Sequence, residues 1–166
     1  MNPYATIGLL VGMALLQTTL VPHLSVAGVK PDLMLMAVVS WSLLRGAGEG
    51  IVWGAIGGLI LDLLSGGPFG ICTLSLILVG YLTGLGEINI FRANILLPGV
   101  TVLFATLVYN LALLLLLQIL GWPVTWGLNL LRIILPAILW NMVLMPLVYT
   151  PLRWLHRATG REEMEI

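Results

Sequence analysis

The chain has 166 residues, of which 60% are hydrophobic and 8% are charged, and its mean hydropathy is +1.09. A soluble domain carries about 25% charged residues, so the composition indicates an integral membrane protein. The formal net charge is zero, from 7 basic and 7 acidic residues, which gives no reason to expect a nucleic-acid partner. The single cysteine, Cys72, excludes an intrachain disulfide and a cysteine-based metal site.

Six apolar segments follow one another, at about 4–21, 32–44, 50–64, 69–86, 95–120 and 128–151, and a polar tail occupies 153–166. We therefore expect an all-α bundle of six transmembrane helices in one domain. The first segment lacks a basic leader and a small-residue cleavage site, so we predict a spanning helix, not a signal peptide. The segment 32–44 covers only about 20 Å as a helix, so it must borrow flanking residues or thin the bilayer.

An even number of spans puts both termini on the same side of the membrane. With cytoplasmic termini, the inner side holds Arg45, Arg92, Arg153, Arg157 and Arg161, and the outer side holds Lys30 and Arg132. The excess of inner arginines predicts cytoplasmic termini. The same orientation places Trp41, Trp53 and Trp154 near the inner ends of spans and Trp122 and Trp126 near the outer end, as in an aromatic belt.

Small residues form a stripe in the segment 50–64. Four-residue spacing places Gly50, Gly54, Gly58 and Asp62 on one helical face. Such a face allows two helices to approach closely, and the pattern recurs at Gly80 and Gly84 and at Gly8 and Gly12. Two interpretations stay open: internal packing, or a groove for the transmembrane helix of another protein.

Asp62 and Arg132 are the two charges placed well inside spans, at similar predicted depths near the outer surface. Each would cost about 2.5–3.5 kcal/mol if left unpaired in the bilayer. We hypothesise that the two side chains pair, directly or through water. In the alternative, Arg132 extends to the headgroups and Asp62 caps the helix that follows.

The turn SGGPFG at 65–70 follows Asp62. Gly66 and Gly67 can adopt positive φ and end the preceding helix in a left-handed cap. Pro68 suits the first turn of the next helix, and the turn through Gly70 predicts a tight hairpin. A phosphate-binding loop is not indicated, because there is no Walker lysine, preceding strand or nearby basic residue.

No catalytic constellation is visible in the sequence, so we expect neither enzyme activity nor a cofactor. Gln17, Asn110, Gln118 and Asn141 are isolated polar residues within spans, and we interpret them as donors and acceptors of interhelical hydrogen bonds. They do not align as a proton or ion path.

Three motifs stand out between residues 30 and 70: Lys30-Pro31-Asp32-Leu33, Arg45-Gly46, and the stretch from Asp62 to Gly70, DLLSGGPFG. In these motifs the chain resembles the bacterial rod shape-determining protein MreD family. The resemblance implies a scaffold of the cell-wall elongation machinery in the inner membrane. The implied partners are MreC, through its transmembrane helix and extracytoplasmic domain, the RodA-type glycosyltransferase with its penicillin-binding transpeptidase, and, indirectly, MreB.

The MreD family is also similar in fold to the substrate-binding S components of energy-coupling-factor transporters, and this supplies an alternative function. An S component needs a polar, ligand-sized pocket near the outer surface, for which the chain offers Asp62, Arg132, Gln17 and Gln118. The outer loops are short, however, and the chain has few aromatic residues near the outer surface. We therefore favour the scaffold and expect no small-molecule substrate.

Overall fold

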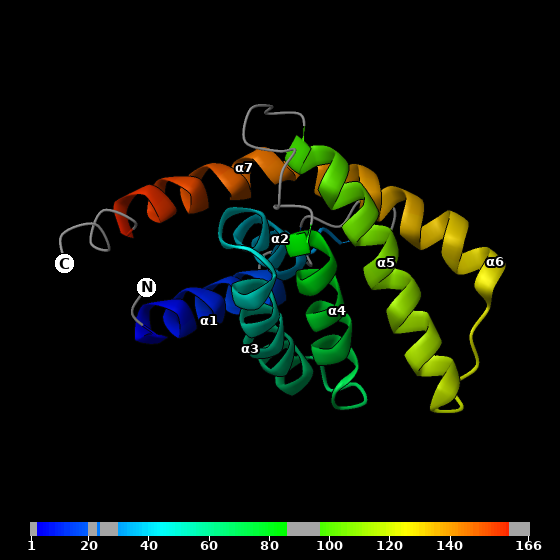
Figure 1. The fold of residues 1–166 in the computed structure, drawn as a ribbon. Helices are drawn as coiled ribbons and strands as arrows, with labels where there is room; N and C mark the ends of the chain where they lie inside the picture. The colour runs from blue at the N-terminus through cyan, green and yellow to red at the C-terminus, as the bar shows by residue number, and fades with distance from the viewer. Residues whose placement is uncertain (1–2, 20–22, 24–29, 86–96, 160–166) are drawn as a thin grey trace.

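The computed structural model describes residues 3–19, 23, 30–85 and 97–159. These residues form an all-α fold without strands (Figure 1). The helices are α1 (Pro3–Thr19), α2 (Leu33–Arg45), α3 (Ala47–Ser65), α4 (Ile71–Leu85), α5 (Leu97–Ile119) and one continuous last helix. That last helix consists of α6 (Trp126–Asn129), a π-helical turn (Leu130–Ile134) and α7 (Leu135–Thr159). The predicted all-α fold class, with six helices, is confirmed.

The short helix α2 lies at the centre of the bundle. It packs against α1, α3, α4, α5 and α7, and every residue from Met34 to Ser42 is buried. A helix that is apolar on all sides is stable only when it is enclosed, and α2 has no polar face. Because longer helices surround α2, lipid does not have to adapt to its length of 13 residues.

The antiparallel helices α3 and α4 form the closest pair in the bundle. A Cβ atom added at Gly54 would lie 2.5 Å from the carbonyl oxygen of Leu76, and one at Gly50 would lie 2.6 Å from the carbonyl oxygen of Gly80. At Gly58 a Cβ would collide with the backbone of Thr73. Internal packing, not an external groove, is therefore the role of the stripe on α3.

The turn between α3 and α4 follows the prediction in part. Gly66, with φ 65°, ends α3 in the left-handed conformation, and Gly70 has φ 97°. Since α4 begins at Ile71, Pro68 lies within the turn. The prediction that Pro68 starts the next helix is wrong, because the chain needs the extra residues up to Gly70 to reverse direction.

The last helix is longer than the apolar pattern suggests. It runs from Trp126 to Thr159 and passes through Pro146 and Pro151, although the sequence predicts an end at 151. Proline is tolerated inside membrane helices because neighbouring groups compensate for the lost backbone hydrogen bond. The predicted tail is helical up to Thr159, and 160–166 lie outside the described residues.

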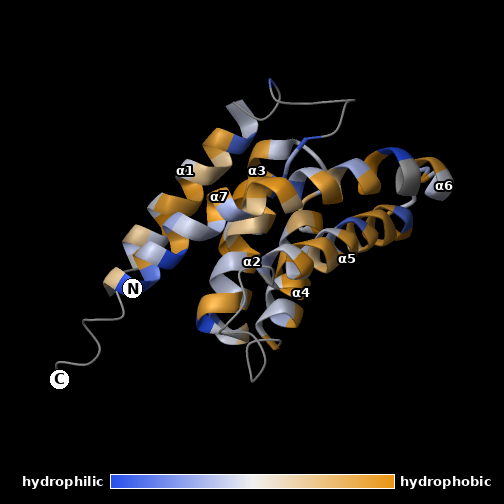
Figure 2. Cartoon of the chain, turned by 90° about the horizontal axis from the view of Figure 1, so that it is seen from above, coloured by the Kyte–Doolittle hydropathy of each residue, from blue (hydrophilic) through white to orange (hydrophobic). Residues whose placement is uncertain are grey.

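Three helices are long and apolar enough to cross a membrane: Ala47–Ser65, Pro98–Ile119 and Trp126–Ala158. The other three helices are shorter but also apolar. Hydrophobic residues cover much of α1, α3, α5 and α7 (Figure 2), and large apolar side chains such as Ile7, Phe104 and Leu147 are exposed. A surface of this kind suits a membrane protein. Two of the arginines on which the predicted membrane orientation depends, Arg92 and Arg161, lie outside the described residues.

Candidate functional site

Asp62 occupies the last turn of α3, and its side chain points at the start of α4. Asp62 is only 4% exposed. The carboxylate accepts hydrogen bonds from the backbone N–H groups of Gly70 (3.0 Å), Cys72 (3.0 Å) and Thr73 (3.1 Å), and from the Thr73 hydroxyl (2.5 Å). The first N–H groups of a helix have no partner within the helix, and its positive end favours a carboxylate. Asp62 is therefore the cap of α4.

The predicted pair of Asp62 and Arg132 does not form. Arg132 lies in the π-helical turn, which continues into α7 and packs against α5, and it is exposed. In the described part of the chain, the only ion pair joins Arg45 to Glu49. The alternative given with that hypothesis, in which Asp62 caps the following helix, is the arrangement that the structure contains.

The N-terminus of α2 is capped by Asp32, the residue just before the helix, and by Gln17 of α1. Asp32 accepts a hydrogen bond from the backbone N–H of Leu35 through its Oδ1 atom (2.9 Å). Gln17 of α1 accepts one from the backbone N–H of Met34 through its Oε1 atom (2.8 Å). Because little water reaches a helix end enclosed by other helices, such side chains must satisfy its N–H groups.

Asn141 of α7 completes this arrangement. Its Oδ1 atom accepts a hydrogen bond from the backbone N–H of Asp32 (2.9 Å), and its Nδ2 atom donates one to the Thr106 hydroxyl of α5 (3.0 Å). The polar residues of the spans thus join α1, α2, α5 and α7. The interhelical interpretation is confirmed for Gln17, for Asn141 and for Gln118, whose Oε1 atom accepts a hydrogen bond from Trp126 of α6 (2.9 Å).

Replacing Asn141 by leucine is expected to lower the free energy of unfolding by about 2–4 kcal/mol. The change leaves the Asp32 N–H without its partner, at about 1–3 kcal/mol, and removes one of the two hydrogen bonds of the Thr106 hydroxyl, which still donates to the Val102 carbonyl, at about 1 kcal/mol. Thermal unfolding in detergent measures the effect. Asn110→Leu is the matched control, because the Asn110 amide bonds only to the Thr106 carbonyl of its own helix. Equal losses for the two variants would contradict the proposed role of Asn141.

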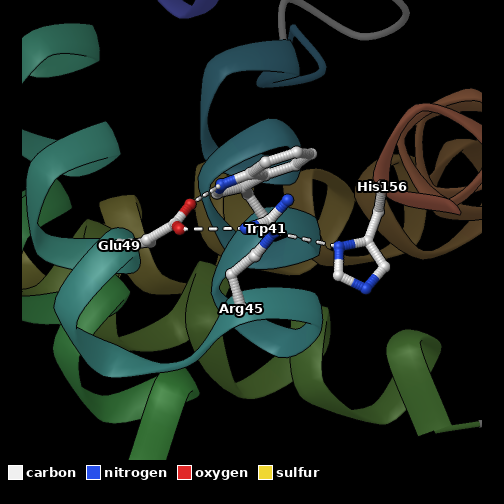
Figure 3. A network of polar contacts seen from close by, with 4 residues as sticks. All are labelled: Trp41, Arg45, Glu49 and His156. Atoms are coloured by element: carbon white, nitrogen blue, oxygen red, sulfur yellow. Dashed lines mark hydrogen bonds and ion pairs between the residues drawn. The ribbon is translucent and has the colours of Figure 1, made fainter. Parts of the chain in front are cut away.

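A second polar cluster lies at the other end of α2, where α2, α3 and α7 meet (Figure 3). The Trp41 indole N–H donates to Glu49 (2.6 Å), and Arg45 Nη1 lies 3.4 Å from the same carboxylate. Arg45 Nε donates to His156 Nδ1 (3.0 Å). Because the Arg45 N–H donates, the Nδ1 atom of His156 is the acceptor in this contact. The four side chains fix the C-terminal part of α7 against the α2–α3 turn.

Aromatic rings complete this second cluster. Trp41 stacks on Trp53 with ring centroids 4.4 Å apart and an interplanar angle of 13°. The guanidinium of Arg45 lies 5.5 Å from the centre of the Trp41 ring. Both tryptophans are buried, so the prediction that they belong to an aromatic belt is wrong. Trp122 and Trp154 are exposed, as a belt requires.

One small-residue face is open. A Cβ added at Gly8 or Gly12 would meet nothing within 4 Å. These glycines lie on α1, which packs mainly against α3 and α2 through its opposite side, where Leu10 and Ala14 are buried. The open face therefore differs from the glycine stripes of α3 and α4, because those glycines pack against the backbone of the neighbouring helix.

In residues 3–19, 23, 30–85 and 97–159, no group of three or more His, Cys, Asp or Glu side chains is placed to hold a metal ion. The described part is instead an all-α membrane bundle with two internal polar clusters around its central helix. The family model of the rod shape-determining protein MreD matches residues 2–159. The chain belongs to the MreD family. No curated protein and no solved structure matches it.

Proposed function

We propose that the protein is a non-catalytic scaffold of the machinery for lateral peptidoglycan synthesis, and that it binds the bitopic protein MreC in the bacterial inner membrane. Membership of the MreD family supports a role in rod shape determination. The described polar side chains are consistent with a scaffold, because most of them bond to backbone or to neighbouring helices and none forms a catalytic arrangement. Partners are met within the bilayer or next to it.

The orientation that we propose has both termini in the cytoplasm. The start of α1 and the end of α7 lie on the same side of the molecule (Figure 1). In this orientation Arg153 and Arg157 of α7 lie towards the cytoplasm, as does Arg45, which bonds to His156 near the end of α7, whereas Arg132 lies near the opposite end of the last helix. The positive-inside rule favours this arrangement.

The open face of α1 is the observation that carries the binding proposal. At its centre, Gly8 and Gly12 are spaced four residues apart, and larger exposed side chains such as Ile7 and Leu16 flank them. Small residues between larger ones let the backbone of a second helix approach closely, and this drives association where lipid offers no hydrophobic gain. We propose that the transmembrane helix of MreC packs on this face.

Replacing Gly8 and Gly12 together by leucine is expected to reduce co-purification of MreC at least tenfold without unfolding the protein. The measurement is the amount of MreC retained on the affinity-tagged protein in detergent. Gly127→Leu is the control, because Gly127 is an equally open glycine on α6. Undiminished capture by the double variant contradicts the docking face. Undiminished capture of MreC without its own transmembrane helix contradicts recognition in the membrane altogether.

The alternative function, a substrate-binding S component, has less support from the structure. Of the side chains available to a ligand pocket, Asp62, Gln17 and Gln118 are engaged in hydrogen bonds within the protein. Mass spectrometry of the purified, denatured protein tests this alternative, because a vitamin or other small molecule released in stoichiometric amount would favour it over the scaffold.

A further inference from the structure

The last turns of α7 present two different faces. Val148 and Leu152 are buried against the bundle, and His156 on the same side bonds to Arg45. The opposite side is exposed and carries Arg153, Trp154 and Arg157. Spacings of three and four residues place these three side chains on one surface, which we call the arginine face. Because the buried side is fixed, the arginine face points away from the protein.

The two arginines of this face have no partner in the described part of the chain. Neither Arg153 nor Arg157 takes part in an ion pair or a hydrogen bond there, in contrast to Arg45, whose guanidinium contacts Glu49 and His156. The Trp154 side chain beside them is 71% exposed. Two free guanidinium groups and an exposed indole are suited to a ligand that is anionic and lies at an apolar boundary.

The length of the last helix places the arginine face at such a boundary. From Trp126 to Trp154 the helix rises about 42 Å, at ~1.5 Å per residue. The hydrocarbon core of a bilayer is about 30 Å thick, and about 40–45 Å with its headgroups. A helix of this length therefore carries Trp154 and the adjacent arginines into one headgroup layer when Trp122 and Trp126 lie in the other. Tryptophan is enriched at this depth.

We propose that the arginine face binds the headgroups of anionic phospholipids. Guanidinium groups form paired, charge-assisted hydrogen bonds with phosphate oxygens, and indole rings favour the layer next to them. Bound lipid of this kind fixes the depth of α7 in the membrane. Lipid binding at the arginine face requires neither MreC nor a role in cell-wall synthesis.

Native mass spectrometry of the full-length protein with added phosphatidylglycerol or phosphatidylcholine tests the proposal. We expect wild-type protein to retain phosphatidylglycerol preferentially. The variant R153Q/R157Q should lose affinity by about fivefold for each arginine removed. Since both side chains are exposed, its thermal unfolding should match that of the wild type. R132Q, which removes an exposed arginine near the other end of the helix, should keep the preference.

Three outcomes overturn the proposal. The first is equal retention of both lipids by the wild type, and the second is unchanged retention of phosphatidylglycerol by R153Q/R157Q. The third is an equal loss in R132Q, which indicates general charge attraction without a defined face. A second measurement is independent of charge: brominated phosphatidylglycerol should quench wild-type tryptophan fluorescence more than that of W154F. Equal quenching would also overturn the proposal.

Discussion

Replacing Gly54 by leucine is expected to prevent the protein from reaching its native fold. Even the first atom of the new side chain would lie 2.5 Å from a carbonyl oxygen and 2.7 Å from a carbonyl carbon of Leu76. Overpacking a core costs about 1–3 kcal/mol when side chains can move aside. Here the obstacle is the backbone of α4, so α3 and α4 must separate, and the cost exceeds that range.

Size-exclusion chromatography and thermal unfolding in detergent measure this effect. We expect Gly54→Leu to yield aggregated protein or protein without a cooperative transition, and Gly54→Ala to be destabilised to a smaller extent. Gly48→Leu is the matched control on the same helix, because a side chain at Gly48 meets nothing within 4 Å. A monodisperse Gly54→Leu protein with wild-type thermal stability would show that α3 and α4 are not packed as described.

The sequence identified the glycine stripes but could not assign their partners. A four-residue spacing is a local property, and it predicts close approach on one face without saying what approaches. Gly50 and Gly80 face each other across the α3–α4 interface, whereas Gly8 and Gly12 face outward. The same motif therefore serves packing in one place and leaves an open surface in the other.

The sequence contains a signal for the central position of α2, but the short length of the segment favours a different interpretation. The segment from Leu33 to Leu44 has no polar face, which is typical of an enclosed helix. It is also too short to span a bilayer comfortably, and this suggested an adjustment of the membrane instead. Hydropathy cannot separate the two cases, because lipid tails are as apolar as leucine side chains. For the same reason, the sequence predicts a lipid interface for Trp41 and Trp53, although both are core residues.

Long-range polar contacts had no local signal at all. Arg45 and His156 are 111 residues apart in the sequence, and Asp32 and Asn141 are 109 residues apart. The sequence predicts interhelical hydrogen bonds for Gln17, Asn110, Gln118 and Asn141, but it does not identify their partners. Asn110 is an exception even to that rule, because it bonds within α5.

The Asp62–Arg132 hypothesis failed for a related reason. Counting residues along two helices estimates how deep each side chain lies, but it gives no information on the side of the bundle that each one faces. Asp62 faces α4, and Arg132 lies on a turn of the last helix that packs against α5. Matching depth is therefore a necessary condition for pairing and a weak predictor of it.

Replacing Asp62 by asparagine is expected to lower the free energy of unfolding by about 3 kcal/mol or more. The carboxylate accepts four hydrogen bonds at the start of α4. An amide keeps one acceptor oxygen, and its NH₂ group faces backbone N–H groups that are also donors. Each buried donor left unsatisfied costs about 1–3 kcal/mol, and the lost charge removes a favourable interaction with the positive helix end.

Two further variants distinguish capping from ion pairing. Thr73→Val removes the hydroxyl, one of the four donors, and should cost about 1 kcal/mol. Arg132→Gln should leave stability unchanged, because Arg132 is exposed and does not contact Asp62. All three are compared by thermal unfolding in the same detergent. If Arg132→Gln and Asp62→Asn lost similar stability and the double variant lost no more, the two charges would be coupled and the carboxylate would not act only as a cap. Stability that depends on Asp62 and Thr73 but not on Arg132 would identify the capped α3–α4 hairpin as the unit that fixes the shape of the bundle.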